Sequence, residues 1–410
     1  MIVAPKIHGF ICTTAHPDGC KKHVTEWIDY VKKQTHLSHG PKKVLIIGAS
    51  TGFGLSSRIV AAFGARAKTI GVFFEKPASE KRTASPGWYN TAAFEKAAYK
   101  SGLYAKSING DAFSDEIKQK TIELIKQDWQ GGVDLVIYSI ASPRRIHSKT
   151  GKIFNSVLKP IGQSYRNKTV NIMTGEVSEV TIKPATEKEI QNTTAVMGGD
   201  DWALWITSLL DNNCLTKKTK TVAFTYIGSE LTHAIYRDGT IGRAKLHLEE
   251  TAKKLDSLLK SELKGQAIIS VNKALVTQAS VAIPIVPLYI SLLYKVMKEK
   301  NLHEGCIEQM WRLFNDHLYC NRDFPVDEKG RIRIDDLEMR DDVQAEVKKL
   351  WKSINSENAN QISDITGYRR DFYKLFGFGL SDINYKQDID INVSILSNEV
   401  ISKIELPPLL

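Results

Sequence analysis

The stretch VLIIGASTGFG (44–54) decides the fold. Its first part, VLII (44–47), is a short apolar run ending at a glycine, which is typical of a buried strand in a parallel sheet. Its second part has the spacing G-x3-G-x-G, and LSSRIVAAFGA (55–65) then indicates a helix. A glycine-rich turn between a strand and a helix exposes N–H groups that bind phosphate. The stretch therefore predicts a phosphate-binding turn, with an ordinary strand-to-helix turn as the alternative.

Strand and helix patterns alternate on the C-terminal side of this turn. Further strands are predicted at 69–75, 103–108, 133–141, 220–228 and 266–271. Helices are predicted at 91–100, 114–129 and 242–263, with Ser114 as an N-cap, and one more precedes the turn at 24–34. Such alternation predicts an α/β fold of the Rossmann type, a doubly wound, mostly parallel sheet flanked by helices.

Two regions depart from this rhythm. TVNIMTGEVSEVTIK (169–183) alternates apolar and polar residues around Gly175, which predicts a β-hairpin inserted within 152–190. The chain after 295 is helical and charged, with candidate helices at 303–318, 336–354 and 365–376, and is weakly patterned from 384. Because no linker separates these parts, we expect residues 1–410 to form one large domain, with 296–410 a helical extension packed on the main sheet.

Composition excludes several classes of protein. Of 410 residues, 42% are hydrophobic and 25% charged, which argues against wholesale disorder and a polytopic membrane protein. The five cysteines (12, 20, 214, 306 and 320) form no CxxC pair, which fits a reducing, cytoplasmic location. Lys6 and His8 interrupt the first apolar stretch, so it does not resemble a secretory signal.

One apolar stretch is long enough to cross a bilayer. Residues 274–294 contain no charge over 21 residues. Pro284 and Pro287 would break a helix in its middle, so a buried loop followed by a helix is the favoured interpretation. We therefore expect no integral membrane segment.

The net charge of +10 raises the question of nucleic acid. The lysines are scattered, however, and no zinc-finger or RNP signature is present. The interpretation as a nucleic-acid-binding protein would rest on net charge alone, so we expect no nucleic-acid partner. Moderate positive charge also suits an anionic ligand or an acidic partner protein.

Two His-x2-Cys pairs, His303/Cys306 and His317/Cys320, imitate zinc-ligand pairs. On one continuous helix, 14 residues would separate the pairs by about 21 Å. Tetrahedral zinc needs every ligand within about 2.3 Å of the ion. We therefore expect no metal.

Two charged pairs leave alternatives open. Asp200 and Asp201 suit a helix N-terminus better than a metal site or an acid pair. Arg144 and Arg145 could bind a cofactor or carrier phosphate, although a solvated loop is slightly favoured.

The ends of the predicted strands supply the residues expected to bind a dinucleotide. Glu75 follows the second strand, where a carboxylate accepts hydrogen bonds from ribose hydroxyls and repels a 2′-phosphate, so NADH is favoured over NADPH. Lys76 beside it weakens that preference, and a solvated charge is the alternative. The expected cofactor-binding residues here are Gly48, Ala49, Ser50, Thr51, Gly52, Phe53, Gly54, Phe74, Glu75, Asp111, Ala112, Ser139 and Ile140.

Tyr226, Tyr236 and Lys245 follow the strand KTVAFTYIG (220–228). Reductases of the short-chain dehydrogenase superfamily use a tyrosine hydroxyl that donates to a substrate oxygen. A nearby lysine holds the nicotinamide ribose, and its charge favours the phenolate. The usual spacing is Y-x3-K, whereas nine positions here would place the two on opposite sides of one helix. We therefore expect Tyr236 on a loop, Lys245 in the first turns of the next helix, and Tyr226 facing the same crevice.

The pattern Tyr226-x9-Tyr236-x8-Lys245 resembles the trans-2-enoyl-CoA reductase and FabV-type enoyl-acyl-carrier-protein reductase family. MIVAPKIHGFI (1–11), GASTGFG (48–54), YSIASPRR (138–145) and NKALVTQAS (272–280) are also similar to that family. The resemblance extends over essentially the whole chain, and the Y-x8-K spacing is its most specific mark.

The resemblance implies NADH-dependent reduction of a trans-2-enoyl thioester to the saturated acyl thioester, the last reductive step of fatty-acid elongation. In this family hydride reaches the β-carbon, a tyrosine matching Tyr236 stabilises the enolate and donates the proton, and one matching Tyr226 contacts substrate. Lys245 would bind the nicotinamide ribose. Further cofactor contacts are implied for Ala274, Leu275, Val276 and Thr277. The apolar residues Ile283, Ile285, Val286, Leu288 and Tyr289 suit an acyl-chain wall or plain core packing equally.

Several alternatives stay open at this point. The thioester could be carried by acyl carrier protein or by coenzyme A, the latter in short-chain metabolism. A catalytically inactive nucleotide sensor is a different possibility, although intact Tyr236 and Lys245 argue against it. We expect a monomer.

Overall fold

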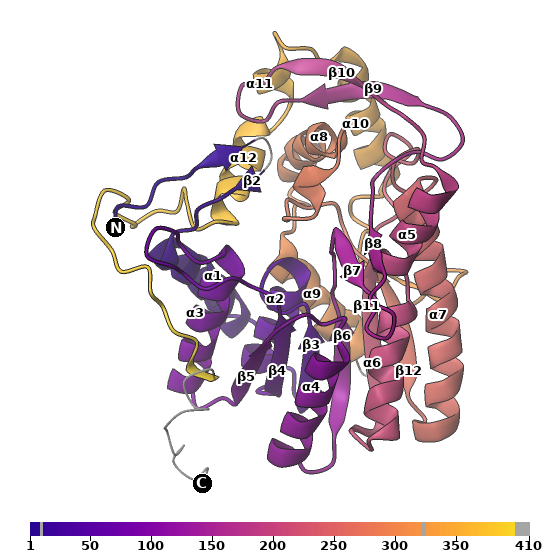
Figure 1. The fold of residues 1–410 in the computed structure, drawn as a ribbon. Helices are drawn as coiled ribbons and strands as arrows, with labels where there is room; N and C mark the ends of the chain where they lie inside the picture. The colour runs from indigo at the N-terminus through magenta and orange to yellow at the C-terminus, as the bar shows by residue number, and fades with distance from the viewer. Residues whose placement is uncertain (9–10, 321–324, 398–410) are drawn as a thin grey trace.

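A parallel sheet runs through the centre of the protein (Figure 1). The structure is a computed structural model that describes residues 1–8, 11–320 and 325–397. Within these residues the sheet has seven strands in the order β13-β12-β11-β6-β3-β4-β5, all paired in parallel. The strands are β3 (Lys43–Ile47), β4 (Lys68–Phe73), β5 (Ala105–Asn109), β6 (Val133–Tyr138), β11 (Leu215–Thr225), β12 (Gln266–Val271) and β13 (Ile332–Arg333). The chain order reverses between β3 and β6, so the prediction of a doubly wound Rossmann-type fold is confirmed.

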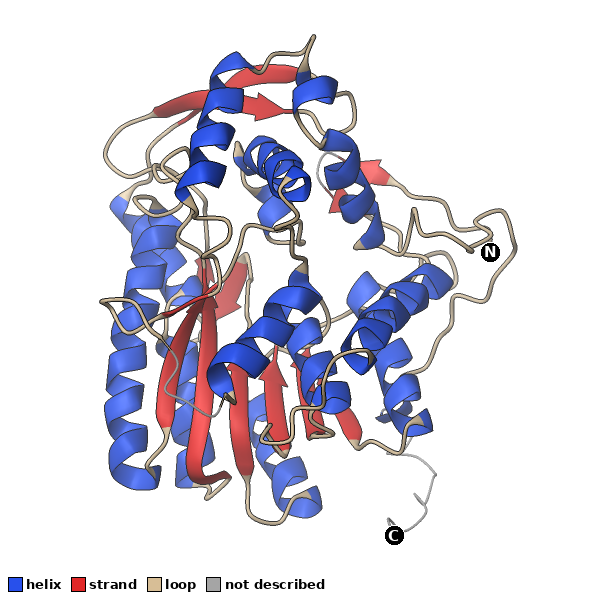
Figure 2. Ribbon diagram, turned by 180° about the vertical axis from the view of Figure 1, so that it is seen from behind, coloured by secondary structure: helices blue, strands red, loops and turns tan. Residues whose placement is uncertain are grey.

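Side chains of the central strands build a separate core on each face of the sheet. In β3, Val44 and Ile46 join one core and Leu45 the other, because successive side chains of a strand point to opposite faces. One face is covered by α1 (Pro17–Lys32), α2 (Gly52–Ile59), α3 (Pro86–Lys100) and α9 (Cys306–Arg312). The other is covered by α4 (Asp115–Asp128), α6 (Asp200–Asp211) and α7 (Thr240–Leu263), against which α5 (Glu187–Met197) packs. Figure 2 shows the sheet enclosed between these helices.

A third core forms a cap beyond the carboxyl ends of the strands, at the top of Figure 1. Its centre is α8 (Val286–Glu299), which is buried along nearly its whole length. The cap also contains β9 (Tyr165–Val170), β10 (Val177–Ile182), α10 (Asp341–Ser353), α11 (Ala359–Ile362) and α12 (Ile365–Lys374). Two short hairpins complete the fold, β1 (Ile7–His8) with β2 (Ile11–Cys12) and β7 (Arg144–Ile146) with β8 (Ile153–Asn155).

Three predicted strands extend too far at their carboxyl ends. β4 ends at Phe73, β6 at Tyr138 and β11 at Thr225, so Glu75, Ser139 and Tyr226 lie beyond the ladder. Hydrogen bonding to the neighbouring strand continues for one residue after β3 and β6, with Gly48 N donating to Val72 O and Ser139 N to Ile47 O. Apolar character continues past these points because the residues line a crevice instead of a sheet. β12 has the predicted bounds.

Several helices have different bounds from those predicted. α1 and α3 begin earlier than predicted, at Pro17 and Pro86. Proline is favoured at the first position of a helix, where its missing N–H group would have no partner within the helix and its fixed φ already suits the helix. The 303–318 helix begins only at Cys306 and ends in a π-helical segment, Leu313–Leu318. The helices predicted at 336–354 and 365–376 are shorter than expected and correspond to α10 and α12. Ser114 is confirmed as an N-cap, since its hydroxyl accepts from Ile117 N.

Both special regions are found. β9 and β10 form the predicted antiparallel hairpin around Gly175, although β9 begins at Tyr165. The apolar stretch 274–294 is a loop that is mostly buried but exposed at Gln278 and Ala279, with a 3-10 turn at Ser280–Ala282, followed by α8 with Pro287 in its first turn. Among the described residues, no helix combines the length and the hydropathy that crossing a bilayer requires.

Candidate active site

The glycine turn lies at the point where the strand order reverses. Gly48 follows β3 with a φ of +90°, and a Cβ there would meet Ser139 O at 2.1 Å. Gly54 approaches so closely that its Cβ would lie 1.9 Å from Gly48 O. These contacts explain why only glycine fits at both positions. Gly48 must adopt a positive φ in the turn, and Gly54 must let α2 pack directly on the turn. Gly52, with a φ of +53°, is the first residue of α2 and borders open space.

A cavity of about 660 Å³ opens from this turn toward β4 and β5. Glu75 lies at its edge, where its carboxylate accepts from Ser50 Oγ at 2.7 Å and its backbone N–H donates to Asn109 Oδ1 at 2.9 Å. Burial raises the pKa of Glu75. Phe74, which is 77% exposed, and Asp111 also line this cavity. The geometry suits an adenosine whose ribose hydroxyls reach Glu75.

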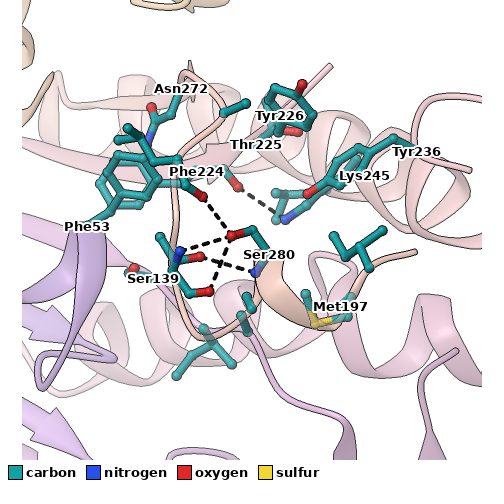
Figure 3. Close-up of a pocket in the computed structure, with 18 of the residues that line it drawn as sticks. Phe53, Ser139, Met197, Phe224, Thr225, Tyr226, Tyr236, Lys245, Asn272 and Ser280 are labelled. Atoms are coloured by element: carbon teal, nitrogen blue, oxygen red, sulfur yellow. Dashed lines mark hydrogen bonds between the residues drawn. The ribbon is translucent and has the colours of Figure 1, made fainter. Parts of the chain in front are cut away.

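A second cavity of about 170 Å³ continues from the first and shares Phe53, Ser139 and Thr277 with it. Tyr236 and Lys245 lie side by side in its wall, with Tyr226 next to them (Figure 3). The rings of Tyr226 and Tyr236 meet edge to face, with centroids 4.6 Å apart. Tyr226 follows β11, Tyr236 lies in a series of turns, and Lys245 is in the second turn of α7. The arrangement that the unusual spacing predicted is therefore present.

Burial controls the protonation of both groups. It raises the pKa of Tyr236 to about 12 and lowers that of Lys245 to about 8. Lys245 Nζ donates to Phe224 O at 3.1 Å. Desolvation dominates the environment of the Tyr236 phenol and holds it in the protonated form, opposite to the direction in which the lysine charge acts. At neutral pH the cavity holds a neutral phenol, which is a proton donor, beside a charged ammonium.

Most residues expected to bind the cofactor line the joined cavities, with three exceptions. Ala49 is fully buried beside Gly71, Gly54 packs on Gly48, and Val276 faces a separate cavity that includes Tyr294. The residues predicted for the site that line the two cavities are Gly48, Ser50, Thr51, Gly52, Phe53, Phe74, Glu75, Asp111, Ala112, Ser139, Ile140, Lys245, Ala274, Leu275 and Thr277, together with the two tyrosines, Tyr226 and Tyr236.

The apolar stretch after Thr277 divides between the two roles left open. Ile283 and Val286 line the second cavity together with Ile290. Ile285, Leu288 and Tyr289 pack in the core behind it. The stretch therefore contributes both to the cavity wall and to the core of the cap, and α8 supplies residues to each.

The sequence did not single out several residues of the second cavity. Thr225 and Asn272 are buried there, and within the described residues Thr225 Oγ1 and Asn272 Nδ2 have no hydrogen-bond partner. Met197, at the end of α5, also lines the wall. Asn272 lies in NKALVTQAS (272–280), one of the stretches that resemble the family, and this resemblance was a signal that could have identified it. Such unpartnered polar atoms are expected where a polar ligand binds.

One member of each charged pair near the site is buried against structural partners. Arg145 is buried and donates to Ala195 O at 2.8 Å, so it does not solvate a loop, whereas exposed Arg144 lines the first cavity. Asp200 and Asp201 lie in the first turn of α6 as expected, but Asp201 is buried and accepts from Lys118 and from the hydroxyl of Tyr138.

No group of three or more His, Cys, Asp or Glu side chains capable of holding a metal occurs in the described part of the chain.

The fold and the site define a nicotinamide-nucleotide-dependent oxidoreductase of the Rossmann type. Three family models match the chain: the NAD(P)H binding domain of trans-2-enoyl-CoA reductase at 2–80, the trans-2-enoyl-CoA reductase catalytic region at 82–319, and the enoyl reductase FAD binding domain at 326–389. The chain belongs to the trans-2-enoyl-CoA reductase family, as the resemblance predicted.

Individual relatives are similar over nearly the whole chain. An enoyl-[acyl-carrier-protein] reductase [NADH] from Coxiella burnetii is 75% identical over 97% of this chain and 98% of its own length. A trans-2-enoyl-CoA reductase [NADH] from Ruminiclostridium cellulolyticum is 58% identical over 96% and 99%. The crystal structure of Clostridium acetobutulicum trans-2-enoyl-CoA reductase in complex with NADH has a TM-score of 0.93 at 46% identity, covering 95% of this chain and 98% of that one.

The region 326–389 does not fit FAD. Its helices α10 and α12 place their apolar residues in the cap core, and its described residues form no strand–glycine–helix turn of the kind that binds a dinucleotide. The cavity that it borders is lined by three carboxylates, Glu26, Glu308 and Asp371, against one lysine, Lys374, and this charge balance disfavours a diphosphate.

Proposed function

We propose that this chain, an NADH-dependent reductase of trans-2-enoyl thioesters, uses Tyr236 as its proton donor and Lys245 to bind the nicotinamide ribose. The strongest support is that one cavity holds a neutral phenol and a buried ammonium and opens onto the glycine turn. NADH, when bound along this crevice, supplies hydride to the β-carbon of the enoyl group.

Tyr236 acts on the thioester oxygen. Negative charge develops on that oxygen as the β-carbon is reduced, and a hydroxyl already fixed beside it lowers the barrier. A phenol with a pKa near 12 keeps its proton at neutral pH and therefore donates a hydrogen bond. Transfer of its proton to that oxygen gives the enol, whose tautomerisation releases the O–H proton and adds a proton from water at the α-carbon; in a direct route, Tyr236 protonates the α-carbon of the enolate itself, and the phenolate then regains a proton from water.

Lys245 and the glycine turn orient the dinucleotide. The N–H groups at the start of α2 face the first cavity, where a pyrophosphate would lie, and Glu75 marks the adenosine end. Lys245 Nζ is anchored by Phe224 O, which leaves its other protons for the ribose hydroxyls. Thr225 and Asn272 supply further polar atoms at the nicotinamide end.

We assign acyl carrier protein as the carrier, which places the enzyme at the last reductive step of fatty-acid elongation. The supporting observation is the 75% identity with the relative named for acyl carrier protein, against 58% with the one named for coenzyme A. The net charge of +10 suits an acidic carrier protein and anionic coenzyme A alike, so the assignment rests on the identities.

We further propose a cytoplasmic monomer formed by one domain. The loop that follows β12 leads directly into α8 at the centre of the cap, and β13 of the C-terminal extension pairs with β12. All five cysteines are free thiols, which suits a reducing compartment.

The test is NADH consumption with crotonyl thioesters of acyl carrier protein and of coenzyme A, at matched concentrations and in parallel with NADPH. We expect turnover on both carriers, with a higher kcat/KM on acyl carrier protein and with NADH. A higher kcat/KM on coenzyme A would reassign the carrier. Tight NADH binding without turnover on either thioester would favour the nucleotide-sensor alternative.

A further inference from the structure

A buried carboxylate lies behind the two tyrosines of the second cavity. Glu338 is fully buried in the turn between β13 and α10, within the C-terminal extension. Its Oε1 accepts from the hydroxyl of Tyr226 at 3.1 Å and from that of Tyr289 at 2.8 Å. Its Oε2 accepts from the backbone N–H of Ala274 at 2.7 Å. One side chain thus binds both a tyrosine of the cavity and the loop that borders the cofactor.

A surrounding hydrogen bond fixes the direction in which the Tyr289 hydroxyl donates, and the Tyr226 hydroxyl donates to the same carboxylate. Gln344 Nε2 donates to the Tyr289 hydroxyl at 3.1 Å and to Glu338 O at 2.7 Å, so the Tyr289 proton points to Glu338. Burial raises the pKa of Glu338, whereas the ammonium of buried Lys273 and the Ala274 amide oppose that rise. The donors that converge on its two oxygens match the acceptor-only carboxylate.

A phenol has one proton, and this limits what Tyr226 can do. With that proton bound to Glu338, Tyr226 presents its ring to the cavity and has no proton for the thioester oxygen. Its ring meets Tyr236 edge to face at 4.6 Å, so fixing Tyr226 also fixes the orientation of Tyr236. We propose that Glu338 is a positioning residue of the reaction: it binds the Tyr226 proton and leaves Tyr236 as the tyrosine that donates to substrate. The inference rests on the proposed function.

It also gives the C-terminal extension a role in catalysis. Glu338 lies 112 residues from Tyr226 along the chain, in the region whose family model is named for FAD. The extension would complete the active site with a carboxylate instead of a second cofactor.

Glu338→Gln tests the proposal with little change of shape. The amide can keep the Ala274 contact through its oxygen while its NH₂ group donates to the tyrosine hydroxyls, which frees the Tyr226 proton to enter the cavity. We expect kcat for crotonyl thioester reduction to fall about tenfold, since small misplacements at a reacting centre are costly. The Kd for NADH, measured by fluorescence, should stay within about twofold because the glycine turn is untouched.

A double-mutant cycle separates positioning from general damage. If Glu338 acts through Tyr226, Tyr226→Phe will lower kcat less in the Glu338→Gln background than in the wild type. Equal fold-losses in the two backgrounds would overturn the proposal. Tyr289→Phe is the matched control, because it removes the other hydroxyl from the same oxygen but lies outside the cavity. It should lower the melting temperature and leave kcat within about twofold.

Two further outcomes are decisive. If Glu338→Gln does not fold, equal losses of kcat in Tyr226→Phe and Tyr289→Phe would show that the network is only structural and overturn the proposal. An absence of turnover in the wild type would remove the proposed function and this inference together. Normal wild-type turnover with additive variants would remove the role of Glu338 alone.

Discussion

The two halves of the crevice are assembled in different ways. The dinucleotide half is built by consecutive elements, β3, α2 and β4, and its principal residues fall within 44–75. The catalytic half brings Tyr226, Tyr236 and Lys245 together with Asn272, and Glu338 joins them from 112 residues beyond Tyr226. The comparison teaches that phosphate binding needs local backbone geometry, whereas proton donation needs burial that only the assembled cap provides.

The largest effect should follow from removing the donor of the catalytic half. Tyr236→Phe should lower kcat by about 10²–10³-fold, the usual cost of losing one donor to a developing oxyanion. NADH binding should be unchanged, because the dinucleotide half is intact. Steady-state kinetics and a fluorescence titration measure the two quantities. Tyr99→Phe, at an exposed tyrosine, is the control. A parallel loss of NADH affinity in Tyr236→Phe would mean that the halves are not separable.

The corresponding change in the dinucleotide half is Gly48→Ala. The new Cβ would lie 2.1 Å from Ser139 O, so the turn must shift and the Kd for NADH should rise at least about tenfold. Gly102→Ala shares the positive φ, at +64°, but a Cβ there meets nothing within 4 Å. It should lower stability without changing NADH affinity. Calorimetric titration and thermal melts of both variants measure this difference, and equal Kd values would refute the role assigned to the turn.

Lys245 connects the two halves, so Lys245→Met should reduce both NADH affinity and kcat, each by about tenfold. The pH dependence of NADH binding gives a second readout. With a pKa of about 8, lowered by burial, the ammonium is charged below pH 8 and loses its proton above it. The Kd for wild type should therefore be level below pH 8 and rise above it. Lys245→Met should bind weakly at all these pH values, and Lys253→Met, on an exposed part of α7, should resemble the wild type.

The smallest effect concerns cofactor choice at the far end of the dinucleotide half. Glu75→Gln removes a charge that would repel a 2′-phosphate, so kcat/KM with NADPH should rise a few-fold while that with NADH changes little. Glu80→Gln, at an exposed carboxylate after the same strand, is the control. If NADPH use does not change in Glu75→Gln, then Lys76 or another group sets the preference.

What could be predicted from sequence follows the same division. The turn at Gly48, the order of strands and the positions of Tyr236 and Lys245 follow from local patterns, because spacing and periodicity act over a few residues. The raised pKa of Tyr236 could not be predicted, since it arises from burial under segments distant in sequence. Glu338 was missed because the sequence placed it in the charged helix predicted at 336–354, and only the assembled fold makes it the buried partner of Tyr226.

The most direct test of the reaction itself is the fate of labelled hydrogen. Crotonyl thioester is reduced with NADH that carries deuterium at the transferable C4 position, in ordinary water, and the product is analysed by NMR. The account predicts a saturated butyryl thioester with one deuterium at the β-carbon and an unlabelled proton at the α-carbon. Deuterium at the carbonyl carbon, or NADH binding without any saturated product, would contradict it.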